Sequence, residues 1–270
     1  ADHARQRDVD ARGDARGHHA DVPLVRGELH ILYGNIYGGL WKIDRSLEHM
    51  RAGLELRRAA LAEDDPELIR ILSDLADVLI RSGRSVEAEQ ILQQTLEGER
   101  LEIPRRARLV LLINLTTLYL DRMDLERAEP VAEQAFELAR AELSPDEALR
   151  MTAESNWAAI LEYSRKDHEA AAQLLERVVQ QKPRSQRDRH PDLMRAKMNL
   201  AVIYGRTGRM EDCARLLEEA LAEQRRELAP GHALTMTTLL NLAQVKELLE
   251  QPDDAEKLRR ERLDAMRKSL

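Results

Sequence analysis

Four of the chain's five asparagines share one register in the C-terminal two-thirds of the sequence. They begin Asn-Leu or Asn-Trp dipeptides at Asn114, Asn156, Asn199 and Asn241, which are 42, 43 and 42 residues apart. A side-chain amide both donates and accepts hydrogen bonds, so a row of amides can match the N–H and C=O groups of an extended peptide of any sequence. If the fold brings these amides into one row, they could contact a polypeptide backbone.

A structural role for the same asparagines is equally consistent with the sequence. Each amide could bond a backbone carbonyl or an adjacent unit and fix the register of neighbouring helices. One amide can serve both roles. The sequence leaves the two roles open.

The residue types that carry out catalysis or bind metals are not arranged for either task. The carboxylate pairs Glu218-Glu219 and Asp253-Asp254 fall on polar helix faces, whereas a catalytic acid needs a pocket that shifts its pKa. Cys213 occupies a place where other units carry alanine, and no histidine partner is suggested for a nucleophilic thiol. His18-His19 has no further ligand at metal-binding spacing. We predict a protein that is not an enzyme and has no cofactor or metal site.

The spacing of the asparagines also predicts the architecture. A fixed period of roughly 20–50 residues is the signature of a stacked repeat protein. Between the asparagines, apolar residues recur at i, i+3, i+4 and i+7, which predicts a first helix and a second amphipathic helix in each unit. The predicted array covers residues 23–270, with units at about 24–60, 64–101, 104–143, 145–182, 190–229 and 230–270, after a polar segment at 1–22.

Turn residues and small residues support this division. The predicted turns within units contain Gly39, Gly83, Met123-Asp124, Lys166-Asp167, Gly208 and Pro252. Glycine there suits a helix end that needs a left-handed residue. A proline at 23, 66, 104, 145, 191 or 230 lies just before each first helix, where its missing N–H costs nothing. Small residues mark the places where helices approach closely: Gly34, Ala76, Thr116, Ala158, Ala201 and Ala243 on first helices, and Ala88, Ala128, Cys213 and Ala255 on second helices.

Composition excludes several classes of function. Charged residues make up 34% of the chain and aromatic residues 3%, which favours long helices over strands. The net charge of −7 disfavours binding to nucleic acid. A single cysteine fits a reducing compartment, and no apolar run approaches the roughly 20 residues that span a bilayer. We therefore expect a cytoplasmic protein, and the initial Ala suggests a segment of a longer one.

The pattern resembles a known repeat family. The segment Ala201-Val-Ile-Tyr204-Gly-Arg-Thr-Gly208, running on to Cys213 and Ala220, is similar to the tetratricopeptide repeat. The period near 42 and the phrase His190-Pro191-Asp192 before Asn199 resemble the longer repeat of kinesin light chains and their bacterial relatives. The resemblance covers about residues 24–270 and is weaker in the first two units, where Leu32 and Asp74 replace the asparagine. Unit six carries Lys246 in place of the tyrosine.

The resemblance implies an all-α, right-handed solenoid of about six helix–turn–helix units whose first helices line a concave groove. The asparagines would then form a ladder on the groove floor, with neighbouring side chains selecting the ligand. The predicted peptide- or partner-binding residues are Asn114, Asn156, Asn199, Asn241, Asp74, Asp77, Tyr163, Arg195, Arg206 and Gln244. Asp74 and Asp77 would form an acidic subsite, and Arg195 and Arg206 a basic one. Trp41 and Trp157 are predicted to pack in the core or turns.

The leading functional hypothesis is a protein-interaction module that binds a peptide or a partner protein in this groove. The alternative is a C-terminal regulatory or scaffold segment of a larger bacterial signalling protein, since arrays of this kind follow serine/threonine kinase domains. A further alternative is self-association through an end unit. No nucleic acid or membrane partner is expected.

Overall fold

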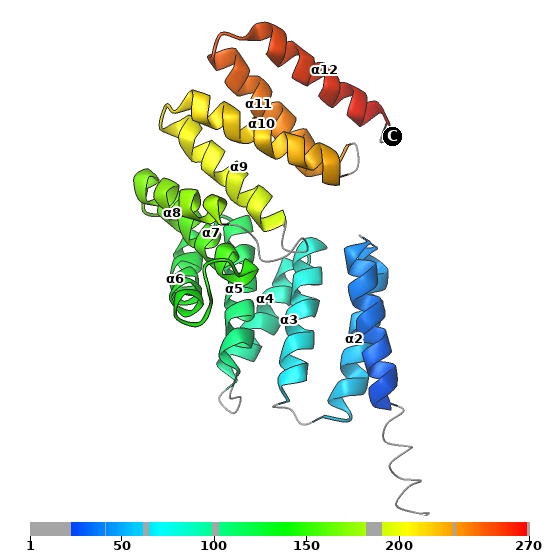
Figure 1. The fold of residues 1–270 in the computed structure, drawn as a ribbon. Coiled ribbons are helices and arrows are strands. Elements are labelled where there is room, and N and C mark those ends of the chain that lie inside the picture. The colour runs from blue at the N-terminus through cyan, green and yellow to red at the C-terminus, as the bar shows by residue number, and fades with distance from the viewer. Residues whose placement is uncertain are drawn as a thin grey trace, which may run out of the picture. The chain divides into compact units, whose positions relative to one another are not determined.

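The computed structural model describes residues 23–40, 42–61, 65–98, 103–181, 191–228 and 231–268. In these ranges the chain forms helices joined by short turns, with no strand (Figure 1). The predicted all-α fold is therefore confirmed. The polar segment 1–22 with His18-His19, the Trp41 side chain and Pro230 lie outside the described residues.

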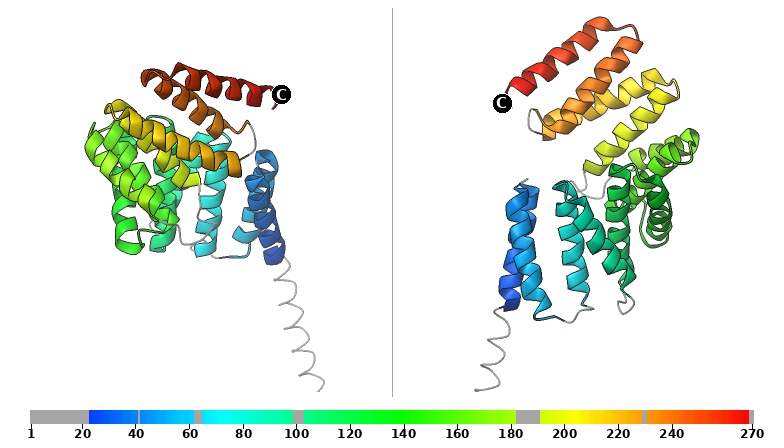
Figure 2. Two further views of the ribbon diagram at one scale, coloured as in Figure 1. Left: turned by 45° about the horizontal axis from the view of Figure 1, so that its top comes forward. Right: turned by 180° about the vertical axis from the view of Figure 1, so that it is seen from behind.

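The chain divides into two compact units, one ending at Arg122 and the other beginning at Met123. The first contains a helix over 23–39, then α2 (Ile43–Arg58), α3 (Pro66–Arg81), α4 (Ser85–Glu97) and α5 (Arg105–Asp121). The second contains α6 (Leu125–Glu142), α7 (Ala148–Tyr163), α8 (His168–Gln180), α9 (Pro191–Arg206), α10 (Met210–Glu227), α11 (Ala233–Leu248) and α12 (Pro252–Lys268). Helices joined by short turns lie antiparallel, as α9 to α12 illustrate (Figure 2).

The first helices begin at or shortly after the predicted prolines. Pro66 and Pro191 are the first residues of α3 and α9, and Pro104 is the N-cap of α5. At α3 the Asp65 carboxylate accepts a hydrogen bond from the Glu67 backbone N–H at 2.8 Å. Such a cap satisfies an amide that the helix itself leaves unpaired.

The small residues lie where the sequence predicts close helix contact. Ala76, Ala158, Ala201 and Ala243 on first helices, and Ala88, Ala128 and Ala255 on second helices, are at most 1% exposed. At Gly34 even one added methyl group would lie 2.7 Å from the Met50 side chain. The larger apolar side chains fill the remaining space between the helices, since Ile71, Leu92, Ile160 and Leu217 are among those that are almost fully buried.

A left-handed residue ends the first helix in five of the helix pairs. Gly83 and Gly208 have φ values of +76° and +81°, as the sequence predicts. Met123, Lys166 and Glu250 occupy the same place with φ between 55° and 58°. The predicted turns at Met123-Asp124 and Lys166-Asp167 thus contain a left-handed residue that is not glycine, and the left-handed Glu250 was not predicted. Two predicted turn residues are corrected: Gly39 ends the helix over 23–39, and Pro252 is the first residue of α12.

The non-glycine turns yield a stability prediction. A left-handed conformation costs roughly 1–2 kcal/mol for a residue that carries a Cβ. Glycine removes this cost from the folded state, but it also increases the conformational entropy of the unfolded chain, which offsets part of the gain in stability. Lys166→Gly should therefore raise the free energy of unfolding by about 0.5–1 kcal/mol, measured by urea denaturation.

The matched control is the reverse change at the equivalent turn. Gly208→Ala should lower the free energy of unfolding by about 1 kcal/mol. Loss of stability in Lys166→Gly would contradict the assignment of strain to this turn.

Candidate functional site

The predicted site residues lie on first helices. Among these helices, α3 packs directly against α5, and α7 against α9. In the first unit the predicted residues are Asp74 and Asp77 on α3 and Asn114 on α5. In the second unit they are Asn156 and Tyr163 on α7, Arg195, Asn199 and Arg206 on α9, and Asn241 and Gln244 on α11.

The acidic residues of the first unit are paired with bases on their own helix. Arg70 donates to Asp74 at 3.1 Å, and the Arg81 guanidinium lies 2.9 Å from Asp77. Burial raises the pKa of the Asp74 carboxyl, and Arg70 together with a hydrogen bond from Asn35 partly opposes this rise. Arginines on the same helix thus largely neutralise the negative charge of the predicted acidic subsite. Asn35, the fifth asparagine, enters the site here although it lies outside the 42-residue register.

Asn114 supplies a contact between neighbouring first helices. Its side-chain amide donates to the Ser73 backbone carbonyl on α3 at 3.3 Å and lies 3.3 Å from the Ser73 hydroxyl. This is the register-fixing role that the sequence leaves open. The half-buried side chain can still contact a ligand with its remaining groups.

The amides of the second unit differ in their exposure. Asn156 is 8% exposed, so only a small part of its surface can reach a ligand. Asn199 and Asn241 are half-buried, and Gln244 is exposed. The contact surface that these residues offer is therefore concentrated on α9 and α11.

Glu162 organises a cluster on α7 and α9 that the sequence does not reveal. Its carboxylate is 3% exposed and accepts a hydrogen bond from Arg206 Nη1 at 2.6 Å, while His168 Nδ1 lies 2.5 Å from its other oxygen. The Arg206 guanidinium also lies 5.2 Å from the centre of the Tyr163 ring, within cation–π range. Asn199 lines a small cavity together with Glu162 and Tyr163. The structure thus brings Tyr163, Asn199 and Arg206 together, and Glu162 neutralises much of the basic character predicted for Arg206.

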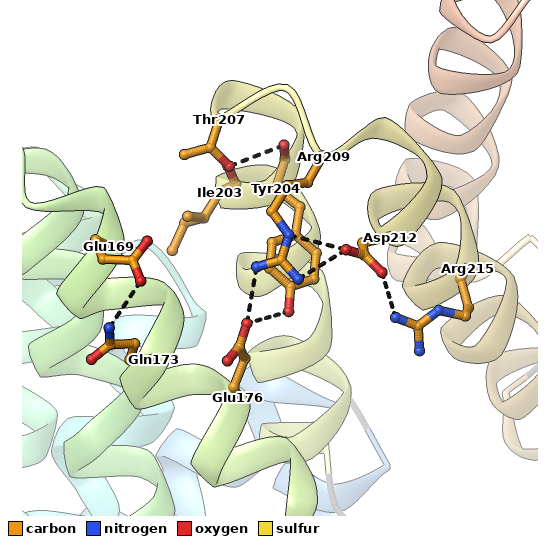
Figure 3. Close-up of polar contacts among 9 residues, drawn as sticks. All are labelled: Glu169, Gln173, Glu176, Ile203, Tyr204, Thr207, Arg209, Asp212 and Arg215. Carbon is orange, nitrogen blue, oxygen red and sulfur yellow. Dashed lines mark hydrogen bonds and ion pairs between the residues drawn. The ribbon is translucent and has the colours of Figure 1, made fainter.

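A second polar network couples α8, α9 and α10 (Figure 3). The Tyr204 hydroxyl donates to Glu176 Oε1 on α8 at 2.6 Å, and Arg209 donates to the same oxygen at 3.1 Å. The Arg209 guanidinium lies 3.8 Å from the Tyr204 ring centre and also contacts Asp212. Burial, followed by the Glu176 carboxylate, raises the pKa of Tyr204 to about 12.

This arrangement recurs along the chain as a joint between successive helix pairs, in which a glutamate on a second helix binds the end of the following first helix. Glu89 accepts from Tyr119 and Arg122, and Glu129 accepts from Ser164 and Arg165. At the last joint Glu218 lies 2.7 Å from Lys246, the residue that replaces the tyrosine. These glutamates precede the ladder asparagines by 23 to 27 residues, a regularity that could have revealed the joints from sequence.

The side chains of Cys213 and Trp157 are packed in the core, where they have no access to a substrate. Cys213 is 3% exposed, and burial raises the pKa of its thiol, which disfavours a nucleophilic role. Trp157 is buried and stacks on Phe136, so its predicted core position is confirmed. Within the described ranges, no group of three or more His, Cys, Asp or Glu residues could hold a metal ion. None of the described helices is long and apolar enough to cross a bilayer.

Comparison with known proteins decides the family. The family model described as Tetratricopeptide repeat matches residues 26–98 and 192–268, which together make up more than half of the chain. The chain belongs to the tetratricopeptide repeat family. The resemblance drawn from the asparagine register and the turn residues is thereby confirmed.

Solved tetratricopeptide repeat structures share the fold at low sequence identity. A putative kinesin light chain from Podospora anserina with nearly identical repeats is 22% identical, with a TM-score of 0.59, and the match covers 76% of this chain and 98% of that one. BtubC from P. vanneervenii is 20% identical, with a TM-score of 0.67 and coverages of 84% and 92%. A Rap protein complexed with competence and sporulation factor is 14% identical, with a TM-score of 0.65 and coverages of 92% and 76%. No curated protein matches the sequence significantly.

The Tyr204 joint predicts a pH dependence of stability. The phenol is protonated in both states below pH 10, the ordinary pKa of a tyrosine, but above it the unfolded state loses the proton first. Stability should therefore fall between pH 10 and the folded-state pKa of about 12. In Tyr204→Phe this part of the decline, roughly 2–3 kcal/mol, should be absent, although the variant is about 1 kcal/mol less stable at neutral pH. Urea denaturation across this pH range tests the difference, and parallel pH profiles would contradict it.

The buried carboxylate predicts a second effect. Glu162→Gln keeps the side-chain shape but removes the charge that Arg206 and His168 contact. Loss of this pairing should lower the free energy of unfolding by about 1–3 kcal/mol. Glu169→Gln, an exposed change on α8, is the control and should alter stability by less than about 0.5 kcal/mol. Equal effects of the two variants would refute the organising role of Glu162.

Proposed function

We propose that the chain is a non-enzymatic protein-interaction module that binds an extended peptide or partner segment on its first helices. Membership of the tetratricopeptide repeat family supports the general class of interaction module. The fold is also that of a Rap protein whose structure was determined with competence and sporulation factor. Among the predicted ladder residues, Asn199 and Asn241 are the principal contacts in this proposal because both are half-buried, whereas Asn156 is buried and Asn114 already donates to Ser73.

The observation that carries the proposal is the cluster around Glu162. Arg206 is 46% exposed in its side chain, yet Glu162 and the Tyr163 ring hold its guanidinium in place. A guanidinium has five N–H donors, so donors remain for a carbonyl or carboxylate of a ligand. A side chain that is already positioned loses little entropy on binding. Asn199, which lines the small cavity with Glu162 and Tyr163, adds an amide that can pair with a peptide backbone.

Selection from a library of random linear peptides provides a probe even though the natural partner is unidentified. The tightest selected peptide is then measured by calorimetry against the wild type and the Asn199→Ala/Asn241→Ala double variant. Loss of two backbone-binding amides should raise Kd at least about tenfold, equivalent to about 1.4 kcal/mol. Arg206→Lys keeps the charge but removes the planar fork, and should also weaken binding.

The matched control removes two amides from a second helix. Gln173 and Gln180 are exposed on α8, so Gln173→Ala/Gln180→Ala should leave Kd within about threefold of the wild type. Thermal melts establish that both double variants are folded. If the two double variants bind the peptide equally well, the first-helix amides are not the binding site.

A second candidate function is self-association, favoured by an exposed apolar stripe on the first described helix and on the turn residue that follows it. The amino-terminal stripe consists of Val25, Leu29, Leu32, Ile36 and Leu40, each between 47% and 59% exposed. The steps of four and three residues between its first four members are the spacing of a coiled-coil seam. A second copy of the same helix presents a matching seam, which suits a symmetric dimer.

Light scattering coupled to size-exclusion chromatography tests the dimer. The wild type should elute as a dimer at tens of micromolar, and Leu32→Glu should convert it to a monomer because the charge would be buried in the seam. Leu248→Glu, which alters a 66% exposed leucine on α11, is the control and should leave the dimer intact. A monomeric wild type would exclude this function.

A further inference from the structure

Two histidines face each other in the first helix pair of the chain. His30 lies on the helix over 23–39 and His49 on α2, and their Nδ1 atoms are 3.0 Å apart. Both residues are half-buried. Their separation of 19 residues in the sequence differs from the spacing of common metal-binding motifs, so the pair is recognised only in the structure. Neither residue belongs to the predicted peptide-binding face.

Aromatic side chains pack around the His49 ring. The Tyr37 ring stacks on it with 5.4 Å between the ring centres, and the Tyr33 ring lies 5.5 Å from it at a tilt of 46°. The His30 ring lies 5.1 Å from it. These contacts hold the two imidazoles together. Side chains that are already positioned lose little entropy when they bind a ligand.

The distance between the two nitrogens suits a shared metal ion. Imidazole nitrogens bind Zn²⁺ at roughly 2.0–2.1 Å, so two of them in tetrahedral coordination lie about 3.3–3.4 Å apart. Neighbouring ligands in a square-planar site with the same bond length lie about 2.8–3.0 Å apart. The observed 3.0 Å is close to both values. The rings would need to separate by no more than about 0.4 Å to bind an ion in either geometry.

The proton between the two imidazoles can be relocated without ionising either ring. A hydrogen bond between neutral imidazoles needs an N–H on one Nδ1 and a lone pair on the other. When the donating ring carries its hydrogen on Nε2 instead, both Nδ1 lone pairs are available to a metal. Binding therefore replaces one hydrogen bond with two coordinate bonds. His168 differs, because the partner of its Nδ1 is the Glu162 carboxylate.

We propose that His30 and His49 bind one divalent transition-metal ion, such as Zn²⁺, through their Nδ1 atoms. Imidazole suits Zn²⁺, Cu²⁺ and Ni²⁺, whereas Mg²⁺ and Ca²⁺ prefer oxygen ligands. Water molecules supply the remaining ligands. The ion cross-links the helix over 23–39 to α2 and thereby stabilises the folded first pair. A metal here departs from the sequence-based prediction of no metal site, and it rests on neither function proposed above.

Calorimetric titration of the whole chain with Zn²⁺ at about pH 7.5, where imidazole is mostly neutral, tests the site. Loss of a second-shell partner alone lowers metal affinity roughly 10–100-fold, so loss of one of two ligands should raise Kd at least about tenfold. We expect this effect in His30→Gln and in His49→Gln. The matched control is His18→Gln/His19→Gln, which removes two histidines outside the site and should leave Kd within about threefold of the wild type.

A second measurement uses the wild type alone, so it does not depend on the folding of a variant. Paramagnetic Co²⁺ should shift or broaden the imidazole NMR signals of His30 and His49 before those of the other histidines. Thermal melts establish that each variant is folded and should show that Zn²⁺ raises the Tm of the wild type more than that of His49→Gln.

Three results would each overturn the metal site. They are the absence of Zn²⁺ binding at concentrations up to about 1 mM, an unchanged Kd in both single variants, and Mg²⁺ binding as tight as that of Zn²⁺. A Co²⁺ effect confined to other histidines would also overturn it. All these outcomes are separate from peptide binding, because none of the measurements involves a peptide.

Discussion

The structure depends above all on how closely neighbouring helices can approach. Ala76, Ala158, Ala201 and Ala243 are at most 1% exposed, so the helices packed around them leave no room for a water molecule. A helix pair of this kind cannot bury its apolar face alone, so stability comes from contacts with the next pair. The glutamate joints add orientation to this packing. Small residues thus set the distance between neighbouring helices. Carboxylates such as Glu176 hold the C-terminal end of the following first helix in position.

The features of the fold that sequence predicts are those encoded by residue type at regular spacing. Buried alanines, prolines at helix starts and Gly83 or Gly208 at turns each have a steric requirement that few residues meet. Met123 and Lys166 adopt the same left-handed turn because the helices on either side impose it. Packing overrides local preference there. The repeat pattern predicts these two turns, whereas the residue types at Met123 and Lys166 do not predict their left-handed conformation.

The candidate site was less predictable because its main contacts join residues that are distant in sequence. The position of Arg206 on a first helix suggested a basic subsite, but its partner Glu162 lies on the preceding first helix. Likewise, Asn114 was a ladder residue by register, and only the packing of α5 on α3 reveals its bond to Ser73. Pairing of this kind depends on helix rotation and tilt, which a periodic pattern does not specify. The buried oxygens of Gln224 and Thr235, which lack a hydrogen-bond partner, gave no sequence signal because an unpaired atom is a property of the packed state.

The joints of the second unit also bear on its elasticity. Glu129 with Arg165 and Glu176 with Arg209 are partly exposed pairs, with arginine side chains 43% and 45% exposed. Such pairs are worth about 0–1 kcal/mol each, and salt screens them over a Debye length of roughly 10 Å at 0.1 M. The apolar contacts beneath them are insensitive to this screening. Higher ionic strength should therefore weaken these joints while the core stays packed, so we expect bending between successive helix pairs to become easier as the salt concentration rises.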